Sequence, residues 1–154
     1  MSRKIFITWR EFHRDVQILS LALPKIKWQG IVAVTRGGLV PAAILARSLD
    51  IKLIETVCIS SYDDKTHKQS SAKVLKNISK EKEGDGWLVI DDLVDKGTTA
   101  KIIKEMLPKA HYASIYAKEK GKSYADSYVS EINAWIVFPW EETETERLFS
   151  EGDG

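Results

Sequence analysis

The chain has 154 residues, with 23 lysines and arginines against 22 aspartates and glutamates, so its formal net charge is +1. Its apolar fraction of 44% excludes a mainly disordered chain, because burial of that many apolar side chains offsets the entropy lost on folding. The near-neutral charge argues against a general nucleic-acid binder. The lone cysteine, Cys58, cannot form an internal disulfide, and the longest apolar stretch is too short for a membrane span. We therefore expect a soluble, cytoplasmic protein with one domain.

Short apolar runs alternate with helical patterns along the chain. Residues 4–8 predict a first strand, and the capping-box spacing of Thr8 and Glu11 begins a helix that Pro24 ends. Residues 30–34, 53–60, 87–90 and 112–117 predict buried strands, with helices after the first and third of them. Residues 134–138 form a last apolar run. Continuously apolar strands that alternate with helices predict an α/β fold, with a parallel sheet covered on both faces.

Two segments differ from this alternating pattern. Residues 61–86 are mostly polar, and so long a polar insert in a compact domain is typical of a binding loop or a disordered one. Residues 141–154 carry six acidic residues and one basic residue, and we interpret them as an acidic tail. The predicted organisation is therefore one domain at 1–140 followed by the tail.

The most informative motif follows the predicted strand at 87–90. Asp91 and Asp92 emerge at its carboxyl end, where adjacent carboxylates repel each other unless a magnesium ion or a sugar diol lies between them. Gly97, Thr98 and Thr99 then open a helix, whose N-terminal N–H groups and dipole favour a phosphate. From these residues alone, a chance acidic turn that caps a helix stays an alternative. No Walker-type or dinucleotide-binding glycine motif occurs in the chain.

The spacing of the strand, the acidic pair, Asp95, Gly97 and Thr99 resembles the signature of type I phosphoribosyltransferases, which bind 5-phosphoribosyl 1-pyrophosphate (PRPP). Further stretches at 34–41, 56–62, 73–76 and 134–136 follow in the order found in the bacterial xanthine-guanine branch of this family. The resemblance covers about residues 8–140. It implies the type I phosphoribosyltransferase fold, a mostly parallel sheet flanked by helices, with a mobile hood at 61–86.

The resemblance implies a purine salvage enzyme that needs Mg²⁺. Such an enzyme transfers phosphoribose from PRPP to guanine and xanthine, and more weakly to hypoxanthine, giving GMP, XMP or IMP and pyrophosphate. Members of the family are homo-oligomers, commonly tetramers, and some associate peripherally with the inner membrane. Two alternatives stay open: a hypoxanthine-preferring enzyme, and a non-catalytic regulator that senses PRPP or nucleotides. Asp95 together with Lys118 favours catalysis.

The resemblance also implies roles for single residues around PRPP. Arg36 would supply a cationic contact to the pyrophosphate, and Gly37 would permit close approach of the backbone. Asp91 and Asp92 would face the ribose hydroxyls and the magnesium ion, with Asp92 on the metal side. Asp95 would lie beside purine N7 as a candidate proton acceptor. The loop for the 5′-phosphate and ribose would comprise Asp91, Asp92, Leu93, Val94, Asp95, Lys96, Gly97, Thr98 and Thr99.

Besides Asp95, three residues are implied in purine binding, and each of the three has a plain structural alternative. Lys118 would read the 6-oxygen of the purine and so reject adenine, unless it is only a solvated lysine. Trp135 would stack on the base and Ile136 would offer a backbone carbonyl, unless both are core residues.

Two further points concern the binding of PRPP. Lys68 and Lys73 are candidates for the basic contact of the hood. Lys96 and Thr98 stand where the family usually has a small hydroxyl residue and often a glycine. We therefore expect an affinity for PRPP or nucleotides that differs from that of its relatives.

Overall fold

The computed structural model describes residues 3–60, 73–78 and 81–141, and its main element is a six-stranded sheet. The strands are β2 (Gly30–Val34), β3 (Ile54–Ser60), β4 (Lys73–Lys76), β5 (Trp87–Val94), β6 (His111–Ala117) and β7 (Ser127–Glu131). Their spatial order is β4-β3-β2-β5-β6-β7, and every neighbouring pair is parallel except β3 with β4. This topology confirms the predicted α/β fold with a mostly parallel sheet.

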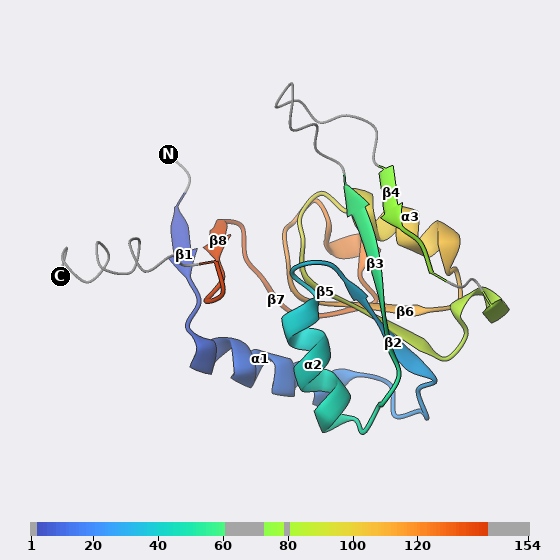
Figure 1. Ribbon diagram of the computed structural model, residues 1–154. Helices are drawn as coiled ribbons and strands as arrows, with labels where there is room; N and C mark the ends of the chain where they lie inside the picture. Colours follow the sequence, from blue (N-terminus) through green and yellow to red (C-terminus); the bar gives the residue numbers. More distant parts are fainter. Residues whose placement is uncertain (1–2, 61–72, 79–80, 142–154) are drawn as a thin grey trace.

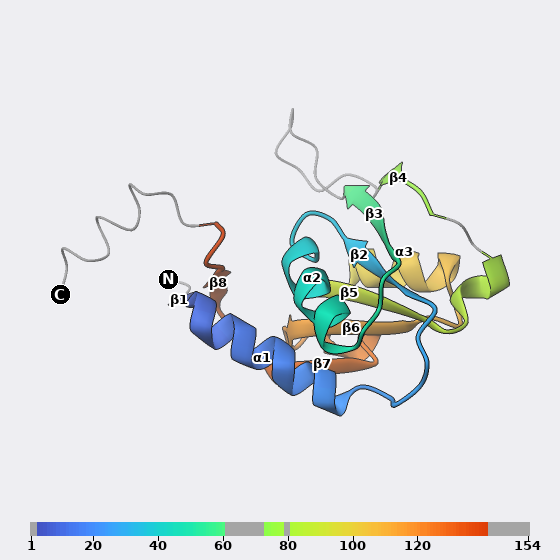
Figure 2. The same ribbon diagram turned by 60° about the horizontal axis from the view of Figure 1, so that its bottom comes forward.

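Helices cover both faces of this sheet (Figure 1). The helices α1 (Trp9–Ala22) and α2 (Leu39–Ser48) lie on one face, and α3 (Thr98–Met106) lies on the other, as Figure 2 also shows. Helix α1 begins with the predicted capping box, because Thr8 Oγ1 accepts a hydrogen bond from the Glu11 N–H at 3.1 Å and Glu11 Oε1 accepts one from the Thr8 N–H at 3.2 Å. Among the helices of the described part, none is long and apolar enough to cross a membrane.

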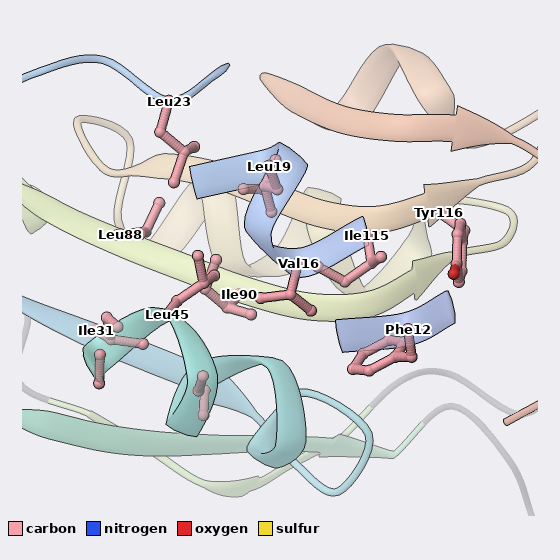
Figure 3. Close-up of a cluster of buried hydrophobic side chains, with 14 of the residues drawn as sticks. Phe12, Val16, Leu19, Leu23, Ile31, Leu45, Leu88, Ile90, Ile115 and Tyr116 are labelled. Atoms are coloured by element: carbon pink, nitrogen blue, oxygen red, sulfur yellow. The ribbon is translucent and has the colours of Figure 1, made fainter. Parts of the chain in front are cut away.

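The larger core cluster lies between the sheet and the helices α1 and α2 (Figure 3). Phe12, Val16 and Leu19 of α1 are fully buried at helical spacing and face the sheet residues Ile90 and Ile115. A second cluster fills the space under α3, with Val32 and Val89 from the sheet against Ile103. Strand residues that alternate between two buried faces explain why the central strands are apolar without interruption.

A smaller sheet joins the two ends of the described chain. Strand β1 (Lys4–Phe6) pairs in parallel with β8 (Trp135–Val137), with Ile5 opposite Ile136. The pair lies beside the main sheet, near the start of α1 (Figure 1). Trp140, just after β8, stacks on Phe138 and packs edge-on against Phe12. Two short 3₁₀ helices, η1 (Glu81–Gly84) and η2 (Lys122–Tyr124), complete the described elements.

Three details differ from the sequence-based expectations. The prediction that strand 87–90 ends before the acidic pair is wrong, because β5 continues to Val94 and pairs with β6 as far as Ala117. The polar insert contains a strand, β4, and a further strand, β7, lies at the other edge of the sheet. Residues 61–72 and 79–80 of the expected hood, including Lys68, lie outside the described residues, as do residues 142–154 of the tail.

Candidate active site

The acidic pair lies in the last part of β5 and is largely held by the protein itself. Asp91 is buried, with 9% of its surface exposed. One of its carboxylate oxygens, Oδ1, accepts a hydrogen bond from the Asp92 N–H at 2.8 Å, and the other, Oδ2, accepts one from the Tyr112 hydroxyl at 3.1 Å. Asp92 Oδ1 accepts a hydrogen bond from the Leu93 N–H at 2.8 Å. Both carboxylates therefore have fixed orientations at the end of the strand.

The surroundings of the pair disfavour two negative charges. Burial and then the charge of Asp92 raise the pKa of Asp91 well above its ordinary value, and burial also raises the pKa of Asp92. A cation or a hydroxyl-bearing ligand between the carboxylates would relieve this cost. Magnesium fits such a donor set, because it binds through one or two carboxylates and keeps several waters. Within the described ranges, no group of three or more histidine, cysteine, aspartate or glutamate side chains could hold a metal ion.

The loop of residues 35–38 connects β2 to α2 and reaches the acidic pair. The Thr35 N–H and hydroxyl both donate to the carbonyl oxygen of Val57 on β3, at 2.9 and 3.2 Å. The peptide bond between Thr35 and Arg36 is cis, and the Arg36 side chain is exposed. A Cβ atom at Gly37 would overlap the carboxylate of Asp92, so only glycine permits this close approach. Gly37 of the loop and Asp92 of the acidic pair, 55 residues apart in sequence, are therefore in direct contact.

The loop of residues 95–99 ends in the first turn of α3. Gly97 is the N-cap and has a φ of 89°, in the left-handed region that favours glycine. The ring of Tyr124 occupies the space that a Cβ atom at Gly97 would need. An α-helix leaves its first N–H groups without an intrahelical partner, and Gly97 has no side chain to cap them. This helix start is therefore suited to a phosphate group.

Lys118 follows β6 and meets Asp95. Its Nζ lies 3.7 Å from Asp95 Oδ1, and the side chains are 24% and 60% exposed, respectively. The Lys118 N–H donates to the carbonyl oxygen of Val94 at 2.9 Å, which fixes the backbone beside the end of β5. A Cβ atom at Gly121 would overlap the carbonyl oxygen of Asp95, so the loop after β6 lies directly on the loop after β5. The structure thus brings Lys118 and Asp95 together.

The remaining predicted site residues, Trp135, Ile136 and Lys73, lie on the strands β8 and β4. Trp135 is 59% exposed on β8, whereas the Ile136 side chain is buried in the core. The Glu119 N–H donates to Asn133 Oδ1 at 2.9 Å, and this bond connects the loop after Lys118 to the segment before β8. Lys73 is exposed at the start of β4, opposite Ser60. Within the described part of the chain, no hydrogen bond or ion pair joins Trp135, Ile136 or Lys73 to the acidic pair.

Four residues that support the site were not singled out from the sequence: Tyr112, Gly121, Tyr124 and Asn133. Each acts through a contact with a segment distant in sequence. Only Tyr112 could have been found from the sequence. It is a tyrosine within a mostly apolar strand, and a buried hydroxyl group needs a polar partner.

The chain is similar to known proteins in both sequence and structure. The phosphoribosyl transferase domain family matches residues 17–147. Xanthine-guanine phosphoribosyltransferase of Nitratidesulfovibrio vulgaris (strain DP4) is 52% identical over 143 residues, covering 90% of this chain and 86% of the relative. The corresponding protein of Desulfotalea psychrophila is 51% identical over 138 residues, covering 88% and 84%. The crystal structure of a purine phosphoribosyltransferase from Pyrococcus horikoshii superposes with a TM-score of 0.75 at 29% identity, covering 91% of this chain and 95% of that chain.

Proposed function

The chain belongs to the phosphoribosyl transferase family, and on this premise we propose that it transfers phosphoribose from PRPP to guanine and xanthine, and more weakly to hypoxanthine. The observation that carries the proposal is the ion pair of Lys118 and Asp95, because Asp95 lies in the short segment that connects β5, with its acidic pair, to the start of α3. The two relatives that share about half of their residues with this chain bear the name of that activity. The products would be GMP, XMP or IMP, together with pyrophosphate.

The site offers separate positions for the parts of PRPP. We assign the 5′-phosphate to the N–H groups at the start of α3, where the helix dipole attracts an anion. Arg36 and the backbone at Gly37 hold the pyrophosphate, and Lys73 adds a second basic contact. Asp91 and Asp92 accept hydrogen bonds from the ribose hydroxyls, with Asp92 also on the side of the magnesium ion. When bound, magnesium neutralises charge on the leaving pyrophosphate.

The reaction forms a bond between ribose C1 and a purine nitrogen and breaks the bond from C1 to the pyrophosphate oxygen. The sugar becomes positively charged in the transition state while negative charge grows on the leaving group. Catalysis therefore depends mainly on the alignment of the reactants and on charge stabilisation. Asp95 accepts the proton that the purine loses at N7 as the new bond forms.

The preference for 6-oxopurines is assigned to Lys118. Its ammonium group donates a hydrogen bond to an oxygen at position 6, whereas the amino group of adenine would bring a second donor against it. A mismatched buried donor is costly, so this contact discriminates strongly. Trp135 stacks on the base, and the backbone carbonyl of Ile136 accepts from its 2-substituent.

Several wider expectations stay predictions: the need for Mg²⁺, the tetramer, the cytoplasmic location, peripheral association with the inner membrane and the absence of a nucleic-acid partner. The organisation into a single domain at 1–140, with a hood and an acidic tail, is also a prediction.

The deciding experiment incubates the purified protein with PRPP and Mg²⁺ and follows nucleotide formation from guanine, xanthine, hypoxanthine and adenine separately. We expect turnover of the three 6-oxopurines, with guanine and xanthine faster than hypoxanthine, and none of adenine. A clear preference for hypoxanthine would favour the hypoxanthine-specific alternative. Saturable binding of PRPP or GMP without turnover would contradict the proposal and favour a regulatory protein. Omission of Mg²⁺ is the control for the metal requirement.

A further inference from the structure

Strand β6 carries two buried tyrosines whose hydroxyl groups donate to carboxylates. Tyr112 donates to Asp91 Oδ2 at 3.1 Å, and Tyr116 donates to Asp15 Oδ2 at 2.6 Å. Both tyrosines are 1% exposed. They differ in location, because Asp91 belongs to the candidate active site whereas Asp15 lies on α1, in the core on the other side of the sheet.

The register of the sheet explains the first of these contacts. Tyr112 lies opposite Val89, two residues before Asp91 on the neighbouring strand. Residues two apart on a strand share a face, so the long tyrosine side chain reaches the Asp91 carboxylate diagonally. The Asp92 N–H donates to the other carboxylate oxygen, Oδ1, so the two hydrogen bonds together fix the orientation of the Asp91 carboxylate. A buried carboxylate without such donors would be strongly disfavoured.

We propose that Tyr112 is a positioning residue for PRPP binding: its hydroxyl holds Asp91, and Asp91 in turn holds the backbone of Asp92, in the orientation that receives the ribose hydroxyls. This inference rests on the proposed function. Tyr112 does not touch substrate, since it lies under α3 among Val89 and Ile103. Phenylalanine would fill the same space, so the hydroxyl is needed for the orientation of Asp91 and not for packing.

The test compares Tyr112→Phe with Tyr116→Phe, a matched control that removes one buried hydroxyl from the same strand. For Tyr112→Phe we expect the KM for PRPP and the dissociation constant of PRPP with Mg²⁺, measured by calorimetry, to rise about tenfold or more, the usual effect of one hydrogen bond to a charged group. The KM for guanine should change less than twofold. Tyr116→Phe should lower the urea midpoint of unfolding and leave both constants for PRPP unchanged.

A double mutant tests the route through Asp91. In an Asp91→Asn background the additional effect of Tyr112→Phe on PRPP binding should shrink, because the two residues act as a unit. Fully additive effects would overturn the inference, as would equal losses of PRPP affinity in Tyr112→Phe and Tyr116→Phe. An unchanged PRPP constant in Tyr112→Phe would overturn it as well.

The inference and the proposed function can fail separately. If the wild-type protein forms no nucleotide, the proposed function fails, and the calorimetric comparison of PRPP binding still decides the role of Tyr112. If the wild-type protein is active and only the expected change in PRPP affinity is missing, the inference alone fails.

Discussion

Asp95 is the residue whose role is most directly measurable. It lies at the site with 60% of its side chain exposed and Lys118 Nζ at 3.7 Å. Because asparagine keeps the shape but cannot accept a proton, Asp95→Asn should lower kcat about 100-fold or more, the usual contribution of a general base. The KM for PRPP should change far less, since Asp95 acts on the purine. Steady-state kinetics with guanine measure both values, and equal losses in kcat and PRPP affinity would contradict the assignment.

A second prediction at the scale of single residues concerns Gly37. In Gly37→Ala the new methyl group would overlap the Asp92 carboxylate, so the loop or the carboxylate must move. A displacement of this kind costs about 1–3 kcal/mol, and we expect the KM for PRPP to rise about tenfold. Gly30→Ala is the control, because its methyl group meets the Trp87 ring at 2.5 Å, at the opposite end of β2. That variant should lose stability to urea while its KM for PRPP stays constant. Similar KM values for PRPP in the two variants would contradict the assignment of Gly37 to the PRPP site.

At the scale of elements, the start of α1 is stabilised by its capping box. Thr8→Ala removes the acceptor of the Glu11 N–H and should lower the free energy of unfolding by about 1 kcal/mol. For a domain of this size, that change corresponds to a fall of about 2–4 °C in Tm. Glu11→Gln retains the capping box and should lose much less. Calorimetric melting of the three proteins checks the expectation, and equal melting temperatures for wild type and Thr8→Ala would contradict it.

Elements with a periodic apolar pattern were predictable from the sequence, and those without one were not. Strands β2, β5 and β6 lie in the middle of the sheet and are buried on both faces, so their apolar runs are continuous. Strands β4 and β7 are edge strands with many polar residues, and only their pairing partners make them strands. The end of β5 was missed because adjacent aspartates are rare in strands, whereas here the ladder with β6 continues past them.

The site was predictable to a similar degree. The acidic pair and the glycine that opens α3 were identified from local spacing, although the pair lies inside β5 and not after its end. The roles of Arg36, Lys118 and Trp135 came from the resemblance to a family, because no local pattern distinguishes a site lysine from a solvated one. The contact of Tyr124 with Gly97 was beyond sequence reasoning, since it joins segments that meet only in the folded sheet.

For the whole molecule, the dependence of stability on pH contains contributions of opposite sign. The pKa values of Asp91 and Asp92 are raised in the folded state, mainly by burial. Their contribution to the free energy of unfolding therefore decreases as the pH rises through the pKa values of the folded state. His111 acts in the other direction. Burial lowers its pKa, the charge of Lys104 lowers it further, and the charge of Asp126 partly opposes both. The contribution of His111 can therefore be isolated only as a difference between two proteins.

The matched variant for this difference is His111→Gln, which keeps a hydrogen-bonding group near Ser127, whose hydroxyl lies 2.8 Å from the His111 Nε2 atom. Since the folded pKa of His111 is below the ordinary value of about 6.5, the unfolded chain binds more protons than the folded one between these two values. The contribution of His111 to stability must then rise with pH across that window and be constant above it. Urea unfolding at intervals from about pH 5 to pH 8 should show that wild type loses more stability on acidification than His111→Gln. Parallel curves for the two proteins would mean that His111 has the same proton affinity in both states.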